Sequence, residues 1–204
     1  MRLGFLGPAQ GKSEELGRAA EFILNVAKVD RAVYLGDDNS LDATVTALAV
    51  KLVGKDPSDD GTWRRAMVLA LSGSPAQMDR FVAAERARLR LRALEALPGH
   101  DGRTIEMIGD RVAVLIHDKA QLDEDDIASA NLLVYGKSPE PLVKKIGARW
   151  FISPGNLGCP GGGLAVLEDN DESVVAEVFD ASGHKTMSET LDMVRKVATR
   201  IQGA

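Results

Sequence analysis

Residues 3–38 read LGFLGPAQGKSEELGRAAEFILNVAKVDRAVYLGDD, and the pattern of this stretch indicates the fold class. It begins with a short apolar run, Leu3 to Leu6, and ends with a second one, Ala32 to Leu35, each followed by a glycine. Between them, apolar residues recur every three or four positions from Leu16 to Val26, which is the spacing of an amphipathic helix. The stretch therefore predicts a strand, a covering helix and a second strand, the repeating unit of an α/β protein.

The rest of the chain extends this α/β pattern. Gly109 and Asp110 separate two apolar runs, which indicates a β-hairpin. Further strands are expected at 67–71, 104–108, 112–116, 132–135, 150–152, 163–167 and 173–179, and helices at 40–53, 77–97, 124–130 and about 186–201. Because no linker or internal repeat interrupts the pattern, we expect one domain over residues 1–204. This domain is a layered α/β sandwich with mixed sheets and an added C-terminal helix.

Composition narrows the class of partner. The formal net charge is −5, and acidic residues dilute the basic run from Arg80 to Arg92, so nucleic acid is not the expected partner. The single cysteine, Cys159, cannot form an internal disulfide, which suits a reducing compartment. No apolar run approaches the length of a membrane span. We therefore expect a cytoplasmic protein that does not enter a membrane.

Short polar motifs follow five of the predicted strands, which is where α/β proteins assemble their sites. They are Gly7-Pro8-Ala9-Gln10-Gly11, Gly36-Asp37-Asp38, Gly73-Ser74-Pro75, His117-Asp118-Lys119 and Gly136-Lys137-Ser138-Pro139. A later segment reads Ser153-Pro154-Gly155-Asn156-Leu157-Gly158-Cys159-Pro160. In this order, the motifs resemble those of the calcineurin-like metallophosphoesterases over about residues 1–180. The resemblance is to the small single-domain class that includes the retromer scaffold subunit.

The resemblance implies a metallophosphoesterase-like fold with two divalent metals that share a bridging carboxylate and activate water. It assigns the bridging position to Asp37 and a ligand position to His117. The family's other ligand positions are occupied here by Pro8, Gln10, Ser74, Lys119, Lys137 and Pro139. Proline has no donor atom to offer a metal, and a lysine ammonium has no lone pair. The sequence therefore predicts a degenerate site with no catalytic residues, no metal and no other cofactor.

Three functions are compatible with such a site. The preferred hypothesis is a catalytically inactive protein that binds a protein partner as a scaffold, with the helix at 77–97 and the C-terminal helix as contact elements. The second is a rewired or residual phosphoesterase that uses Asp37, Asp38 and His117 with a single manganese or other divalent ion. The third is a small-anion or nucleotide sensor built on Lys119 and Lys137. In the alternative interpretation of these lysines, they only form ion pairs with neighbouring aspartates.

Overall fold

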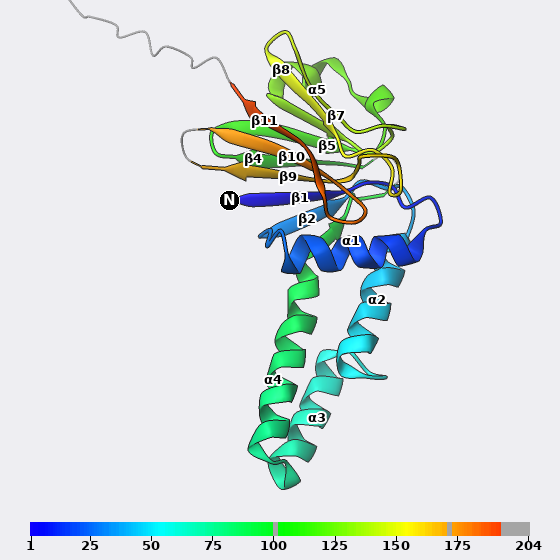
Figure 1. The fold of residues 1–204 in the computed structure, drawn as a ribbon, viewed down its shortest axis with the longest axis vertical. Helices are drawn as coiled ribbons and strands as arrows, with labels where there is room; N and C mark the ends of the chain where they lie inside the picture. Colours follow the sequence, from blue (N-terminus) through cyan, green and yellow to red (C-terminus); the bar gives the residue numbers. More distant parts are fainter. Residues whose placement is uncertain (100–101, 171–172, 193–204) are drawn as a thin grey trace, which may run out of the picture.

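Two mixed β-sheets form the body of the protein in the computed structural model, which describes residues 1–99, 102–170 and 173–192 (Figure 1). The first sheet has the strand order β11 (Lys185–Leu191), β10 (Val174–Asp180), β9 (Gly163–Asp169), β1 (Arg2–Leu6), β2 (Arg31–Tyr34) and β3 (Leu94–Ala96). The second sheet has the order β4 (Arg103–Ile108), β5 (Arg111–Ile116), β6 (Leu132–Tyr135), β8 (Arg149–Ser153) and β7 (Leu142–Ile146). The expected layered α/β sandwich with mixed sheets is confirmed.

Alternation along the strands explains how the layers pack, because successive side chains of a strand point to opposite faces. Phe5 and Val33 face the second sheet, where they share a core with Leu115, Val134 and Ile152. The alternate residues of β1 and β2 face the other way, onto helix α1 (Ser13–Asn25). On the outer side of the second sheet, a smaller cluster packs beside helix α5 (Glu124–Ser129); it contains Val114, Ala130 and Leu133. The apolar core therefore lies mainly between the two sheets and under α1.

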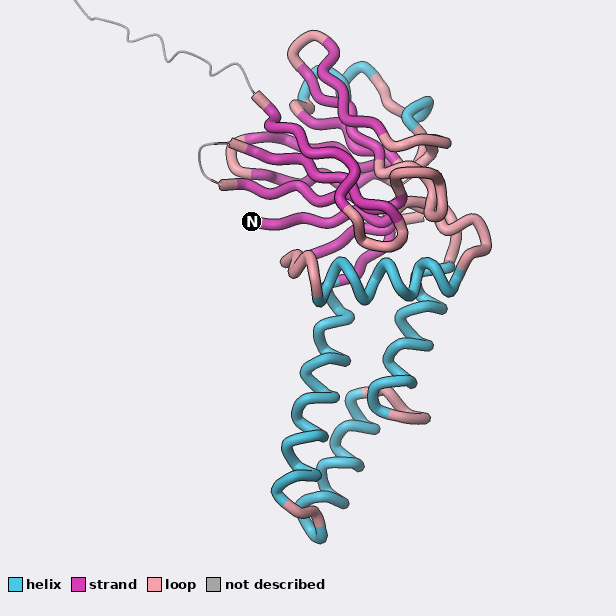
Figure 2. Tube along the Cα trace, viewed as in Figure 1, coloured by secondary structure: helices cyan, strands magenta, loops and turns pink. Residues whose placement is uncertain are grey.

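Three helices between β2 and β3 form an arm that extends from the body beyond α1 (Figures 1 and 2). They are α2 (Ser40–Val53), α3 (Asp59–Ser72) and α4 (Pro75–Arg90), and a short 3₁₀ turn, Leu91–Ala93, leads from α4 into β3. The prediction of a third strand at 67–71 is wrong, because these residues belong to α3. The helix expected at 77–97 ends early, and its last residues contain β3, the true third strand of the parallel set.

Local capping explains the error at 67–71. The Ser58 side chain accepts a hydrogen bond from the Gly61 backbone N–H, and Asp59 and Asp60 occupy the first turn of α3. Both features stabilise a helix that starts here and continues through the apolar run. A short apolar run is compatible with a strand or a helix on periodicity alone, and the cap is the signal that separates them.

Two further differences concern the C-terminal half. β7 was not predicted from the sequence; it pairs antiparallel with β8 around a turn at Gly147. Residues 185–191 form β11 rather than the start of the C-terminal helix expected from about 186, because they pair with β10. The rest of that expected helix lies outside the described residues. In the part of the chain that is described, no helix is both long and apolar enough to cross a bilayer.

The close approach of β1 to the loop after β8 yields a test of the fold. A Cβ on Gly7 would lie 1.9 Å from the carbonyl oxygen of Gly155, whereas a Cβ on Gly17 of α1 would meet only Thr44, at 3.9 Å. We expect Gly7→Ala to lower the free energy of unfolding by about 3 kcal/mol, because backbone must move to make room. The control, Gly17→Ala, should raise it by about 1 kcal/mol through helix propensity. Urea denaturation of both variants measures the difference, and equal stabilities would contradict the packing described here.

Candidate functional site

The carboxyl ends of β1, β2, β5 and β6 meet at one edge of the sandwich, and we call this edge the rim. β1 and β2 are parallel, as are β5 and β6, so the segments that follow these strands emerge on the same side. Hydrogen bonds then join the two sheets at this edge. The rim brings together four of the polar motifs singled out in the sequence, those that begin at Gly7, Gly36, His117 and Gly136.

His117 links the two sheets at the centre of the rim. Its Nδ1 lies 2.7 Å from the Leu35 carbonyl oxygen, the last residue before the Gly36 turn. A carbonyl can only accept, so Nδ1 carries the proton in this contact. The other ring nitrogen, Nε2, lies 3.5 Å from Oδ2 of Asp37. The backbone carbonyl of His117 also accepts hydrogen bonds from the backbone N–H groups of Gly136 and Lys137, at 3.0 and 2.7 Å.

Lys137 forms an ion pair with Asp118 beside this histidine. Its Nζ lies 2.5 Å from Oδ2 of Asp118, and the resulting hydrogen bond holds the pKa of the Asp118 carboxyl below its usual value. The same contact raises the pKa of the Lys137 ammonium. Lys119 behaves differently, since its Nζ lies 5.4 Å from the centre of the Tyr135 ring, in a cation–π contact. The ion-pair interpretation of the two lysines therefore fits Lys137, whereas Lys119 contacts an aromatic ring.

Tyr34 supplies a polar group at the rim that the sequence did not reveal. It is fully buried, accepts a hydrogen bond from the Ala9 backbone N–H at 2.9 Å and donates one to Oδ1 of Asp38 at 2.9 Å. Burial raises the pKa of Tyr34 to about 12. Burial would also raise the pKa of Asp38, but hydrogen bonds from Ser40 and Tyr34 outweigh it and hold this pKa below its usual value. Tyr34 thus connects the loop after β1 to the loop after β2.

The remaining predicted site residues lie in three places. Pro8 is buried and its carbonyl accepts a hydrogen bond from the Leu157 backbone N–H at 3.0 Å, while Gln10 is exposed with a left-handed φ of 51°. Pro139 is exposed in the loop after β6. The assignment of Ser74 to the site is wrong. It is the N-cap of α4 on the arm, and the true third strand, β3, leads instead into Leu97-Pro98-Gly99.

The donor set at the rim does not fit a two-metal centre. Two metals with a bridging carboxylate need several carboxylate and imidazole ligands. Asp37 and His117 face each other, but Pro8 offers no side-chain donor and Lys137 already neutralises Asp118. Across the described residues, no group of three or more His, Cys, Asp or Glu side chains is arranged to hold a metal ion. We therefore derive no catalytic step through a metal.

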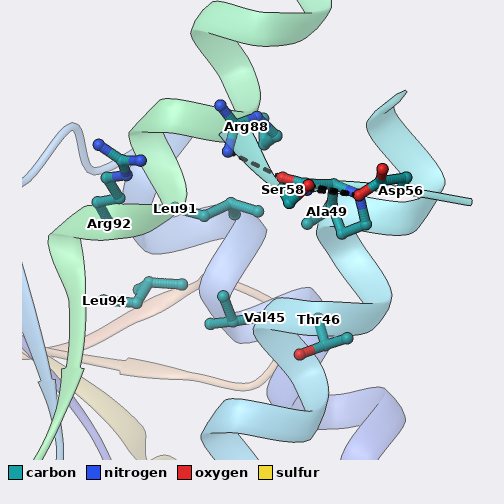
Figure 3. Close-up of a pocket in the computed structure, with 10 residues that line it drawn as sticks. Val45, Thr46, Ala49, Asp56, Ser58, Arg88, Leu91, Arg92 and Leu94 are labelled. Atoms are coloured by element: carbon teal, nitrogen blue, oxygen red, sulfur yellow. Dashed lines mark hydrogen bonds between the residues drawn. The ribbon is translucent and has the colours of Figure 1, made fainter. Parts of the chain in front are cut away.

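A separate cavity of about 430 Å³ lies between α2, the end of α4 and β3 (Figure 3). It is lined by Val45, Thr46, Ala49, Asp56, Pro57, Ser58, Arg88, Leu91, Arg92 and Leu94. Leu94 is the first residue of β3, so the cavity lies at the end of the strand opposite to the rim. The Arg88 guanidinium donates hydrogen bonds to Asp59, Glu85 and the Pro57 carbonyl. These bonds connect α4 to the start of α3 at the base of the arm.

The Tyr34 contacts predict a measurable loss of stability. Tyr34→Phe leaves the buried Ala9 N–H without its acceptor, and we expect the free energy of unfolding to fall by about 1–3 kcal/mol. The pKa of Asp38 should rise at the same time, because it loses a donor. Tyr135→Phe is the matched control, since Lys119 contacts the ring of Tyr135 and the ring is kept. Denaturant unfolding and NMR titration of both variants test this, and equal stabilities would show that the Tyr34 hydroxyl is dispensable.

Comparisons with known proteins extend the picture of the fold. The sequence matches no family profile and no curated protein. Among solved structures, it is similar to a predicted phosphoesterase from Streptococcus pneumoniae, with 14% identity, coverage of 94% of this chain and 98% of that chain, and a TM-score of 0.51. A single mutant of Vps29 from Entamoeba histolytica matches with 13% identity, coverage of 94% and 100%, and a TM-score of 0.49. The two-sheet body thus has a metallophosphoesterase-like fold, as in the first of these structures.

Proposed function

We propose that this protein is a catalytically inactive phosphoesterase-like protein that acts as a protein-binding or scaffold module. The observation that carries the proposal is the donor set of the rim. The chain retains the strand ends that hold metals in an active phosphoesterase, but ammonium, amide and pyrrolidine groups stand where carboxylate and imidazole ligands are required. A cytoplasmic location remains a prediction of the composition.

The charge of Lys137 supports the proposed loss of metal-dependent catalysis. Lys137 lies within 2.5 Å of Asp118, so the carboxylate that stands beside His117 already has its counter-charge. A divalent ion placed about 4 Å from an ammonium would be repelled by several kcal/mol at a surface-like dielectric. This repulsion adds to the missing ligation at Pro8 and to the distance of Ser74 from the rim. The polar groups of the rim stabilise one another without a metal.

The arm supports the binding role. Trp63, Met67, Val68 and Leu71 on α3 are each more than 60% exposed, although all four are large apolar residues. Single exposed apolar residues are normal, but several on one helix mark a surface that contacts something other than water. No residue of α3 belongs to the apolar core of either sheet, whereas Leu41 and Ala49 of α2 do. A protein partner is the class of ligand that fits this surface.

One contact favours a residual phosphoesterase as the second candidate. With the His117 proton on Nδ1, its Nε2 offers a lone pair toward Asp37 at 3.5 Å, and these two groups could share one divalent ion such as manganese. Asp38 would be a third donor, but its Oδ1 already accepts hydrogen bonds from Tyr34 and Ser40. Two donors make a weak site, so we rank this function second.

An anion sensor built on Lys119 and Lys137 has less support. Lys137 is paired with Asp118 and Lys119 lies over Tyr135, so the two ammonium groups are each engaged before an anion arrives. An anion would have to displace Asp118 to bind Lys137. Added inorganic phosphate should therefore leave the melting temperature unchanged, and a phosphate-dependent rise would favour the sensor.

The decisive experiment measures metal content and turnover together. We expect protein purified with manganese to hold well under one metal per chain and to release no nitrophenol from an aryl phosphodiester above background. The double variant Asp37→Asn, His117→Gln sets that background, because it removes the two donors that face each other. Stoichiometric metal in the unmodified protein, with turnover that the double variant loses, would establish the residual phosphoesterase instead.

A further inference from the structure

Several large apolar side chains of the arm lie exposed on α3 and α4. On α3, Trp63, Met67 and Leu71 are 73%, 67% and 84% exposed. They are spaced four residues apart, so they form one stripe along the helix. On α4, Met78 and Val82 have the same spacing and are 41% and 43% exposed. In a helix pair that needed no partner, such stripes would face the other helix.

Charged groups fill the contact between α3 and α4 instead. Glu85 is the one buried residue of α4, and Gly61 is the one buried residue of α3. Oε1 of Glu85 lies 2.6 Å from Nη2 of Arg65 on α3, and Oε2 lies 2.7 Å from Nε of Arg88. The hydrogen bonds from Arg65 and Arg88 hold the pKa of Glu85 below its usual value, although burial acts in the opposite direction. The buried charge of the hairpin is therefore neutralised, and the apolar residues that are not exposed, such as Leu69 and Phe81, are only half-buried.

The exposed area matches what a dimer requires. Trp63, Met67, Val68, Leu71, Met78 and Val82 together leave roughly 700 Å² of largely apolar surface in water, close to the ~800 Å² that each partner contributes to a standard interface. This much exposed apolar surface on two adjacent helices, α3 and α4, is unusual on a monomer. Arg65 and Arg88 of the arm already neutralise Glu85. The buried charge of the hairpin therefore does not require an oppositely charged group from a partner. A surface that complements these stripes would be helical, apolar and of similar size.

The stripe on α3 complements itself. Met67 lies midway between Trp63 and Leu71, four residues from each. If two copies of α3 pack antiparallel about a two-fold axis at Met67, the large Trp63 of each copy meets Leu71 of the other. This is the isologous arrangement that a closed dimer needs, and antiparallel helix pairs of this kind form four-helix bundles.

We propose that the arm docks on the arm of a second copy of this chain, with α3 against α3 in antiparallel orientation about Met67. The proposal rests on the proposed function only in taking the arm as a protein-binding face, and it does not depend on the rim. A dimer would cover the α3 stripes and join the two hairpins into one bundle. The two rims would remain exposed at the far ends of the assembly.

Light scattering of the full chain after gel filtration tests the proposal. At about 50 µM we expect twice the chain mass of 21.8 kDa for the unmodified protein. Met67→Lys should weaken association at least about 100-fold and give the single-chain mass, because both lysines would lie at the two-fold axis. Met107→Lys is the matched control, since Met107 is 54% exposed on β4 in the body, and it should remain dimeric. Circular dichroism checks that both variants are folded.

Cysteine cross-linking tests the geometry independently. In a Cys159→Ser background, Met67→Cys should oxidise to a covalent dimer, because residues at a two-fold axis come within disulfide reach. Met107→Cys should form no covalent dimer under the same conditions, although the chains still associate. A single-chain mass for the unmodified protein, an unchanged dimer in Met67→Lys, or equal cross-linking of both cysteine variants would each overturn the proposal. Turnover in the metal assay by a dimeric protein would instead overturn only the inactive-scaffold function.

Discussion

The hydrogen bond from His117 to the Leu35 carbonyl fixes the distance between the two sheets where their strands end. The bond is 2.7 Å long and ties the end of β5 to the end of β2. Residue 136 lies beside it and must be a glycine, because a Cβ there would come within 2.1 Å of the same carbonyl oxygen. The positions of Asp37, Asp118 and Lys137 follow from this junction. The rim is therefore built by packing and backbone contacts, and it keeps its shape whatever chemistry its side chains can perform.

Under the proposed function the rim holds no metal, and its carboxylates then need another source of positive charge. The Lys137–Asp118 pair supplies one, and the buried Tyr34 hydroxyl stabilises Asp38 as a hydrogen-bond donor. The ion pair is partly exposed, so its contribution to stability is modest, but these contacts give the rim carboxylates partners of their own. Under the proposed function, the residues that replaced the metal ligands also supply the contacts that stabilise the rim carboxylates. Such a change would let the fold persist without its catalytic use.

The sequence predicted the body of the fold better than the arm, for a physical reason. Strands such as Leu132–Tyr135 are short apolar runs that end in turns, and their local pattern suffices. Residues 67–71 and 94–96 are also short and largely apolar, and only the cap at Ser58 and the pairing of β3 with β2 tell them apart. That pairing joins residues far apart in the chain, so the local sequence pattern does not reveal it. The same holds for the site: His117 and Asp37 were placed by motif, whereas the role of Tyr34 depended on its contact with Ala9.

The arm departs from the usual amphipathic hairpin, because it buries Glu85 and leaves several large apolar side chains exposed. Burying Glu85 with Arg65 and Arg88 costs desolvation, which hydrogen bonds largely offset, so the inner face contributes little net stability. The outer stripe from Trp63 to Leu71 meanwhile remains in water, where each such side chain forgoes about 1.5–3 kcal/mol of burial. Helices held this weakly from inside are marginal alone. Covering the outer face would make the arm more stable, so under the proposed function the arm, more than the rim, is the part that binds.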